Sequence, residues 1–148
     1  MKDHPHFLRK ALEVAETASG LRGRYRTGAL IVLGNEIISK GTNSVKSHPF
    51  AKAFSKHPEA IYLHAEHDAI LKASRKLGKR DWHKARLYVA RTTKSSIFGL
   101  AKPCNGCACA INHFKIGLVV YSLDASEHLG YVTYNTKTHD LFMHSEIV

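Results

Sequence analysis

Two short segments, far apart in the chain, carry the residue types that bind a transition metal. The first is His64-Ala65-Glu66 and the second is Pro103-Cys104-Asn105-Gly106-Cys107. The apolar spacing after each segment places it at the opening turn of a predicted helix. Cys104 and Cys107 are three residues apart, so on a helix they share one face and can bind one ion together. The sequence therefore indicates a fold in which the starts of two helices meet.

The residue types in these segments are those of a catalytic zinc site. A helix start favours thiolate over thiol, because its unpaired N–H groups and partial positive charge stabilise the anion. With His64 as third ligand, one tetrahedral position stays open, which is typical of catalytic rather than structural zinc. A water in that position can have its pKa lowered to about 7. Glu66 is expected beside this water, where it could accept a proton, protonate a ring nitrogen and then protonate a departing amine.

A Cys-x-x-Cys pair also occurs in structural zinc knuckles and in redox-active proteins. A knuckle needs a fourth ligand, for which Cys109, His67 and His113 are candidates. Cys109 lies two residues past Cys107, on another side of the helix, so we expect a packed thiol there. A redox pair leaves His64-Ala65-Glu66 without a role.

The two segments together resemble the H-x-E and P-C-x-x-C signature of the cytidine and deoxycytidylate deaminase superfamily. The resemblance extends to Thr27-Gly-Ala-Leu-Ile-Val, which is similar to the first strand of that family. It also includes Gly41-Thr-Asn43, which is similar to the exit of the second strand, where an Asn commonly touches the sugar or its surroundings. In all it covers roughly residues 5–121.

The resemblance implies an α/β fold of three layers, with helices on both faces of a five-stranded mixed sheet. It implies Zn²⁺ bound by His64, Cys104 and Cys107, Glu66 as the catalytic residue, and substrate binding by Asn43 and Ala65. The expected reaction is attack of an activated water on C4 of a cytosine ring, giving the uracil product and ammonia. Relatives assemble as dimers or larger oligomers, so a homo-oligomer is also expected.

The substrate is less constrained than the reaction. A free cytosine nucleoside or nucleotide is the first hypothesis, and the basic residues Arg91, Lys94 and Lys102 favour deoxycytidylate. The alternative is a polynucleotide deaminase acting on C or A in tRNA or single-stranded DNA, which suits the net charge of +10. A zinc-binding protein without catalysis is a third class, and the presence of Glu66 argues against it. The chain also departs from relatives, because Lys102 replaces Ser, Thr or Glu and the stretches 74–84 and 92–102 look long.

The composition fits one globular domain over residues 1–148, with 44% hydrophobic and 23% charged residues. No apolar run approaches the roughly 20 residues of a membrane span, and the N-terminus lacks a signal-peptide core. Three clustered cysteines make a poor disulfide framework. A cytoplasmic protein is therefore expected. His48 and His57 share one loop that has no cysteine, so we expect surface or pocket-rim histidines there rather than a second metal site.

The apolar pattern predicts alternating helices and strands. Helices are expected over 5–19, from Ala65 to near Gly78, and over 104–114, with one further helical turn at 50–54. Strands are expected over 29–33 and 37–39, which form a hairpin, and over 86–90, 118–121 and 131–134. Only about nine residues join the last two strands, too few for a parallel crossover, so they should be antiparallel neighbours.

Overall fold

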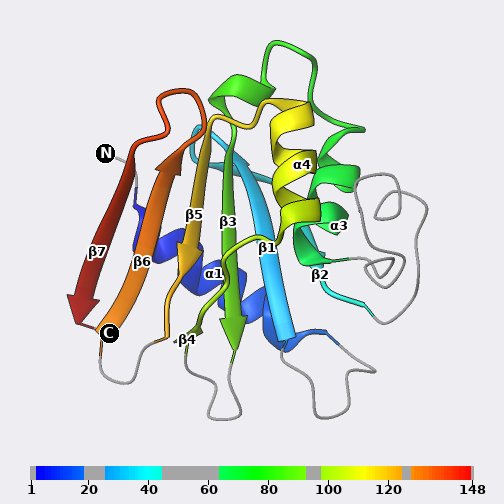
Figure 1. Cartoon of the computed structure of the whole chain (residues 1–148). Coiled ribbons are helices and arrows are strands. Elements are labelled where there is room, and N and C mark those ends of the chain that lie inside the picture. Colours follow the sequence, from blue (N-terminus) through cyan, green and yellow to red (C-terminus); the bar gives the residue numbers. More distant parts are fainter. Residues whose placement is uncertain (1–2, 19–25, 45–63, 93–97, 125–127, 148) are drawn as a thin grey trace.

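The computed structural model describes residues 3–18, 26–44, 64–92, 98–124 and 128–147 (Figure 1). Within them the helices are α1 (His4–Glu16), α3 (Ala65–Ala73) and α4 (Asn105–Phe114), with a short 3₁₀ turn at Trp82–Lys84. The strands are β1 (Arg26–Leu33), β2 (Glu36–Thr42), β3 (Arg86–Thr92), β4 (Phe98–Gly99), β5 (Leu118–Ser122), β6 (His128–Asn135) and β7 (Leu141–Ile147).

The strands form one mixed sheet in the order β2-β1-β3-β5-β6-β7, with β4 pairing to β3. β3 and β5 are parallel, and every other pair is antiparallel. The predicted hairpin is present as β1 and β2, and the predicted antiparallel pair is present as β5 and β6. The sheet is larger than the five predicted strands, because β4 and β7 were not expected.

Helices cover both faces of the sheet, so the predicted three-layer α/β fold is confirmed (Figure 1). α1 packs on one face, where Phe7, Leu8 and Ala11 meet Leu30 and Tyr88. α3 and α4 lie on the other face, over a core that includes Ala29, Leu87 and Val119 from the sheet. Strand residues alternate between these two cores, as the period of two in a strand requires.

Two strand glycines let helices approach the sheet closely. A Cβ atom at Gly41 in β2 would lie 2.3 Å from the carbonyl oxygen of Ala65 and 2.5 Å from the nitrogen of Ala69. A Cβ atom at Gly28 in β1 would lie 2.1 Å from the carbonyl oxygen of Ala11 in α1. Glycine at position 41 therefore fixes how closely the first turn of α3 sits on the sheet.

The start of α1 and the end of α4 follow ordinary capping chemistry. Asp3 precedes α1, and its Oδ1 accepts a hydrogen bond from the backbone N–H of His6 at 3.1 Å. α4 ends at Lys115, which adopts the left-handed conformation common just past a helix terminus. Among the described helices, none has the length and apolar character needed to cross a membrane.

Candidate active site

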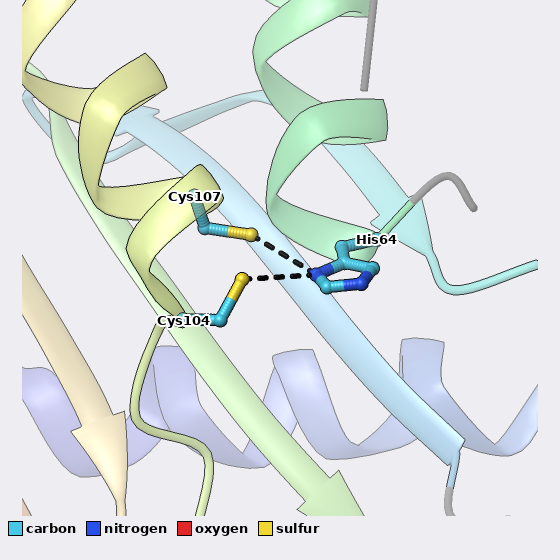
Figure 2. A group of neighbouring side chains, drawn as sticks. All are labelled: His64, Cys104 and Cys107. Atoms are coloured by element: carbon cyan, nitrogen blue, oxygen red, sulfur yellow. Dashed lines mark hydrogen bonds between the residues drawn. The ribbon is translucent and has the colours of Figure 1, made fainter. Parts of the chain in front are cut away.

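The site is formed where α3 and α4 begin on the same face of the sheet. His64 is the N-cap residue of α3 and Cys104 is the N-cap residue of α4. Both have extended backbone conformations, and neither side chain makes a capping hydrogen bond. The imidazole and the thiol are therefore directed to each other rather than to their own helices, and Cys107 joins them from the first turn of α4 (Figure 2).

His64, Cys104 and Cys107 have the geometry of a metal site. Nδ1 of His64 lies 3.3 Å from Sγ of Cys107 and 3.4 Å from Sγ of Cys104. All three potential ligand atoms lie within 4.8 Å of one another. Tetrahedral zinc with ordinary Zn–N and Zn–S bonds separates its nitrogen and sulfur ligands by about 3.5 Å. The three side chains therefore fit a zinc ion, with Nδ1 as the nitrogen that faces it.

The three side chains of the cluster differ in burial. Cys107 is buried, His64 is half-buried and Cys104 is exposed. Within the described residues the cluster offers three ligand atoms and no fourth. Three protein ligands are the number used by catalytic zinc sites, whereas a structural zinc site is closed by four.

The two thiols hold their protons very differently. The pKa of Cys104 is lowered to about 3, chiefly because its sulfur accepts a hydrogen bond from the Cys107 thiol. The pKa of Cys107 is raised by that same hydrogen bond and by burial. The hydrogen bond to Cys104 also raises the pKa of His64. These shared protons are the ones a cation displaces on binding, since zinc takes thiolate and neutral imidazole.

Glu66 lies in the first turn of α3, beside the cluster but outside it. Its side chain is 5% exposed. Burial raises the pKa of this carboxyl group, while its own backbone amide, the charge of His64 and a hydrogen bond with Cys107 act in the opposite direction. The contact with Cys107 brings a carboxyl group to the metal position without making it one of the three ligands.

His67, one of the candidate fourth ligands, lies beside the metal cluster but is not one of its three members. It is buried, and its ring stacks on that of His64 with centroids 5.7 Å apart and planes at 19°. Burial lowers the pKa of His67, so the ring is held neutral. Cys109 and His113, the other candidate ligands, are exposed and do not join the cluster. The prediction of a packed thiol at Cys109 is therefore wrong, although the prediction that it is not a ligand agrees with the cluster.

The two residues predicted to bind substrate lie at the ends of two elements, since Asn43 follows β2 and Ala65 begins α3. Oδ1 of Asn43 accepts a hydrogen bond from the backbone N–H of Thr27 at 2.9 Å, and the backbone N–H of Asn43 donates to the carbonyl of Thr27. Asn43 therefore ties the end of β2 to the start of β1. Ala65 is fully buried at the start of α3.

The structure describes two of the three basic residues that were expected to favour a nucleotide substrate. Arg91 is half-buried at the end of β3, and its charge opposes the rise in the pKa of His64. Lys102 is exposed, just before Pro103. Lys94, His48, His57 and the helical turn predicted at 50–54 lie outside the described residues. Trp82 is buried against Phe114, with ring centroids 4.8 Å apart.

Comparisons with known proteins agree with this geometry. Residues 1–123 match the family model described as the cytidine and deoxycytidylate deaminase zinc-binding region. A tRNA-specific adenosine deaminase from Aquifex aeolicus (strain VF5) is 34% identical over 128 residues, covering 86% of this chain and 71% of that protein.

Two solved structures share the fold. The cytidine deaminase from Burkholderia pseudomallei superimposes with a TM-score of 0.58 at 16% identity, covering 97% of this chain and 93% of the other. A mutant cytidine deaminase from Mycobacterium tuberculosis gives a TM-score of 0.52 at 15% identity, covering 82% of this chain and 85% of the other.

Proposed function

The chain belongs to the cytidine and deoxycytidylate deaminase family and is thus a zinc-type hydrolytic deaminase, and we propose that its substrate is a free cytosine nucleoside or nucleotide, with deoxycytidylate favoured. The observation that carries the proposal is the convergence of His64, Cys104 and Cys107, with Glu66 buried beside them. In this proposal the three donors hold zinc, and Glu66 is the catalytic residue.

Zinc in this position supplies a Lewis acid that lowers the pKa of a bound water to about 7. Glu66 takes the two protons of the attacking water in turn, giving the first to the ring nitrogen and the second to the departing amino group. The carbon–nitrogen bond breaks, a carbonyl forms at the same carbon, and ammonia leaves. A proton-transfer residue placed in this way contributes about 10²–10⁴-fold to the rate.

The C-terminal part of the sheet supports a small substrate. β5 and β6 are antiparallel neighbours joined by residues 123–127 alone. Five residues cannot form the helix that polynucleotide-editing members of the superfamily usually place between the corresponding strands. The half-buried Arg91 and the exposed Lys102 are the cations proposed to contact a substrate phosphate, which favours a nucleotide over a nucleoside. Asn43 and Ala65, at the adjoining strand and helix ends, are proposed to contact the sugar and the base.

Deamination of a base within a polynucleotide is the second candidate. It is favoured by the similarity to the tRNA-specific adenosine deaminase and by the net charge of +10. A basic surface attracts a phosphodiester backbone regardless of its sequence, with an affinity that falls steeply as salt rises.

One assay separates the two candidates. The zinc-loaded full chain is incubated with free cytosine, adenine and guanine nucleosides and nucleotides, and in parallel with tRNA and single-stranded DNA, and ammonia release is measured. Release from deoxycytidine or deoxycytidylate supports the first proposal. Unchanged free nucleotides together with a deaminated oligonucleotide, in a reaction inhibited by added salt, contradict it and support the second. The Cys104→Ala variant serves as the metal-free control.

A further inference from the structure

The orientation of the His64 ring is not fixed by its own helix. His64 is the N-cap residue of α3, and its side chain makes no capping hydrogen bond. Figure 2 shows Nδ1 turned to the sulfurs of Cys104 and Cys107, at 3.4 and 3.3 Å. The torsion that turns an imidazole ring has broad, roughly two-fold preferences, so a neighbouring group is needed to hold the ring in one of its orientations.

The usual support for a ligand histidine is a hydrogen bond at the nitrogen that faces away from the metal. A carboxylate or a backbone carbonyl commonly accepts this bond and fixes the ring. In the part of the chain that the structure describes, His64 makes its hydrogen bonds through Nδ1 alone. Among these residues, the other contact that orients the ring is a stacking contact.

That contact is with His67, one turn further along α3. The two ring planes are 19° apart and their centroids lie 5.7 Å apart, within the range of paired aromatic rings. Residues three apart on a helix lie on one face, which allows these two side chains to meet. The flat face of His67 therefore limits the rotation of the His64 ring.

His67 is itself held in place by burial and by α4. Its side chain is 2% exposed and is among the largest fully buried side chains of the described residues. Burial lowers the pKa of His67, and the interaction of its ring with the backbone of Gly106 acts in the opposite direction. Gly106 lies between Cys104 and Cys107 at the start of α4. The ring of His67 thus contacts both chain segments that carry the metal ligands.

We propose that His67 is a positioning residue of the zinc centre, whose ring holds His64 in the orientation that turns Nδ1 to both sulfurs. It is not one of the three ligands, so its effect is on metal affinity and on coordination geometry. Groups that orient a ligand histidine typically contribute about 10–100-fold to metal affinity. The inference rests on the zinc site of the proposed function and is independent of the substrate.

The first test compares two apolar substitutions of comparable volume in the full chain. His67→Leu removes the flat ring, whereas His67→Phe keeps a flat ring without its nitrogens. Zinc affinity is measured by competition with a chromophoric chelator. We expect binding about 10–100-fold weaker in His67→Leu, and within about threefold of the wild type in His67→Phe, because burial keeps the ring in place. Wild-type affinity in His67→Leu, or an equal loss in both variants, overturns the proposal.

A substitution elsewhere in α3 separates positioning from general packing. Ile70 is fully buried in the same helix and does not contact the metal cluster. Ile70→Val should therefore unfold at a lower urea concentration than the wild type, both measured without metal, while its zinc affinity is unchanged. A loss of zinc affinity as large as that in His67→Leu would show that packing accounts for the effect, and would overturn the proposal.

The visible spectrum of the Co²⁺-loaded chain gives a readout of geometry that is separate from affinity. Co²⁺ binds the same nitrogen and sulfur donors as Zn²⁺, and its absorption depends on the coordination geometry. His67→Phe should keep the wild-type spectrum, and His67→Leu should alter it. An unaltered spectrum in His67→Leu contradicts the proposal but leaves the proposed function standing. A wild-type chain that binds neither Zn²⁺ nor Co²⁺ overturns both.

Discussion

Nδ1 of His64 lies 3.3 Å from Sγ of Cys107, although 43 residues separate the two in the chain. The contact joins the N-cap of α3 to the first turn of α4, so both helix starts must be placed correctly for the metal site to form. Packing of these helices on the sheet and the chemistry of the site are therefore coupled. Substitutions of metal ligands and substitutions at the contact between helix and sheet can separate the effects on chemistry from the effects on packing.

The three cysteines should differ in their effect on zinc. Cys104→Ala and Cys107→Ala each remove a donor that lies close to Nδ1 of His64, so the purified variants should contain almost no zinc and release no ammonia. Cys109→Ala changes an exposed thiol outside the cluster, so this variant should keep its zinc and its release of ammonia. Metal analysis after gel filtration measures zinc directly. Loss of zinc in Cys109→Ala equal to that in Cys104→Ala would mean that the donor set is wrong.

Removal of the metal should destabilise the folded chain. A ligand present at about a thousand times its dissociation constant stabilises the native state by about 4 kcal/mol. For a domain of this size, that corresponds to a fall of roughly 10 °C in the melting temperature when a chelator is added. The Cys104→Ala variant should show no further change with chelator. A chelator effect of the same size in that variant would place the zinc elsewhere.

Glycine 41 should matter to the site as well as to stability. In Gly41→Ala the new Cβ meets the backbone of Ala65 and Ala69, so the start of α3 must move away from the sheet. We expect a loss of about 1–3 kcal/mol in unfolding free energy together with weaker zinc binding. Gly28→Ala is the matched control, because it displaces α1 on the opposite face. It should lose similar stability while its zinc affinity is unchanged.

Tyr88 should give the chain a stability loss at alkaline pH. It is fully buried, accepts a hydrogen bond from Nε of Arg86 at 2.9 Å, and lies 2.7 Å from Nδ1 of His4. Burial raises the pKa of Tyr88 in the folded chain, so above about pH 10 the unfolded chain releases this proton first. Stability therefore falls as pH rises through that range.

Urea unfolding of the wild type and of Tyr88→Phe tests this. At neutral pH the variant should be less stable by about 1–3 kcal/mol, because Arg86 loses a hydrogen-bond acceptor. Its stability should then decline less than that of the wild type above about pH 10. Parallel declines in the two proteins would assign the alkaline loss to other groups.

The sequence predicted most of the site because its chemistry is local. The spacing of Cys104 and Cys107, and of His64 and Glu66, sets which groups share a helix turn. The strands that were predicted have a buried face, whose apolar residues mark them in the sequence. β7 was missed because Leu141, Phe142 and Met143 are exposed on both faces, so no alternation marks the strand. β4 was missed because its two residues pair with β3 inside a segment expected to be loop.

Long-range packing accounts for the rest. The stacking of His67 on His64 depends on how far α3 is buried against the sheet and α4, and no pattern within the helix reveals that. α3 was expected to extend to near Gly78, but the regular helix ends at Ala73 and is followed by turns at Lys76 and Leu77 that bond back to Ala73. Helix ends are set by such local bonds, which periodicity does not specify.

The central claim is that His64, Cys104 and Cys107 bind the metal while Glu66 moves the protons. Measuring zinc content and ammonia release on the same preparation of Glu66→Gln tests it most directly, because glutamine keeps the shape of the side chain but cannot carry the proton. We expect one zinc per chain, as in the wild type, and ammonia release lower by about 10²–10⁴-fold. Zinc lost together with activity, or activity retained without the carboxyl group, would contradict the claim.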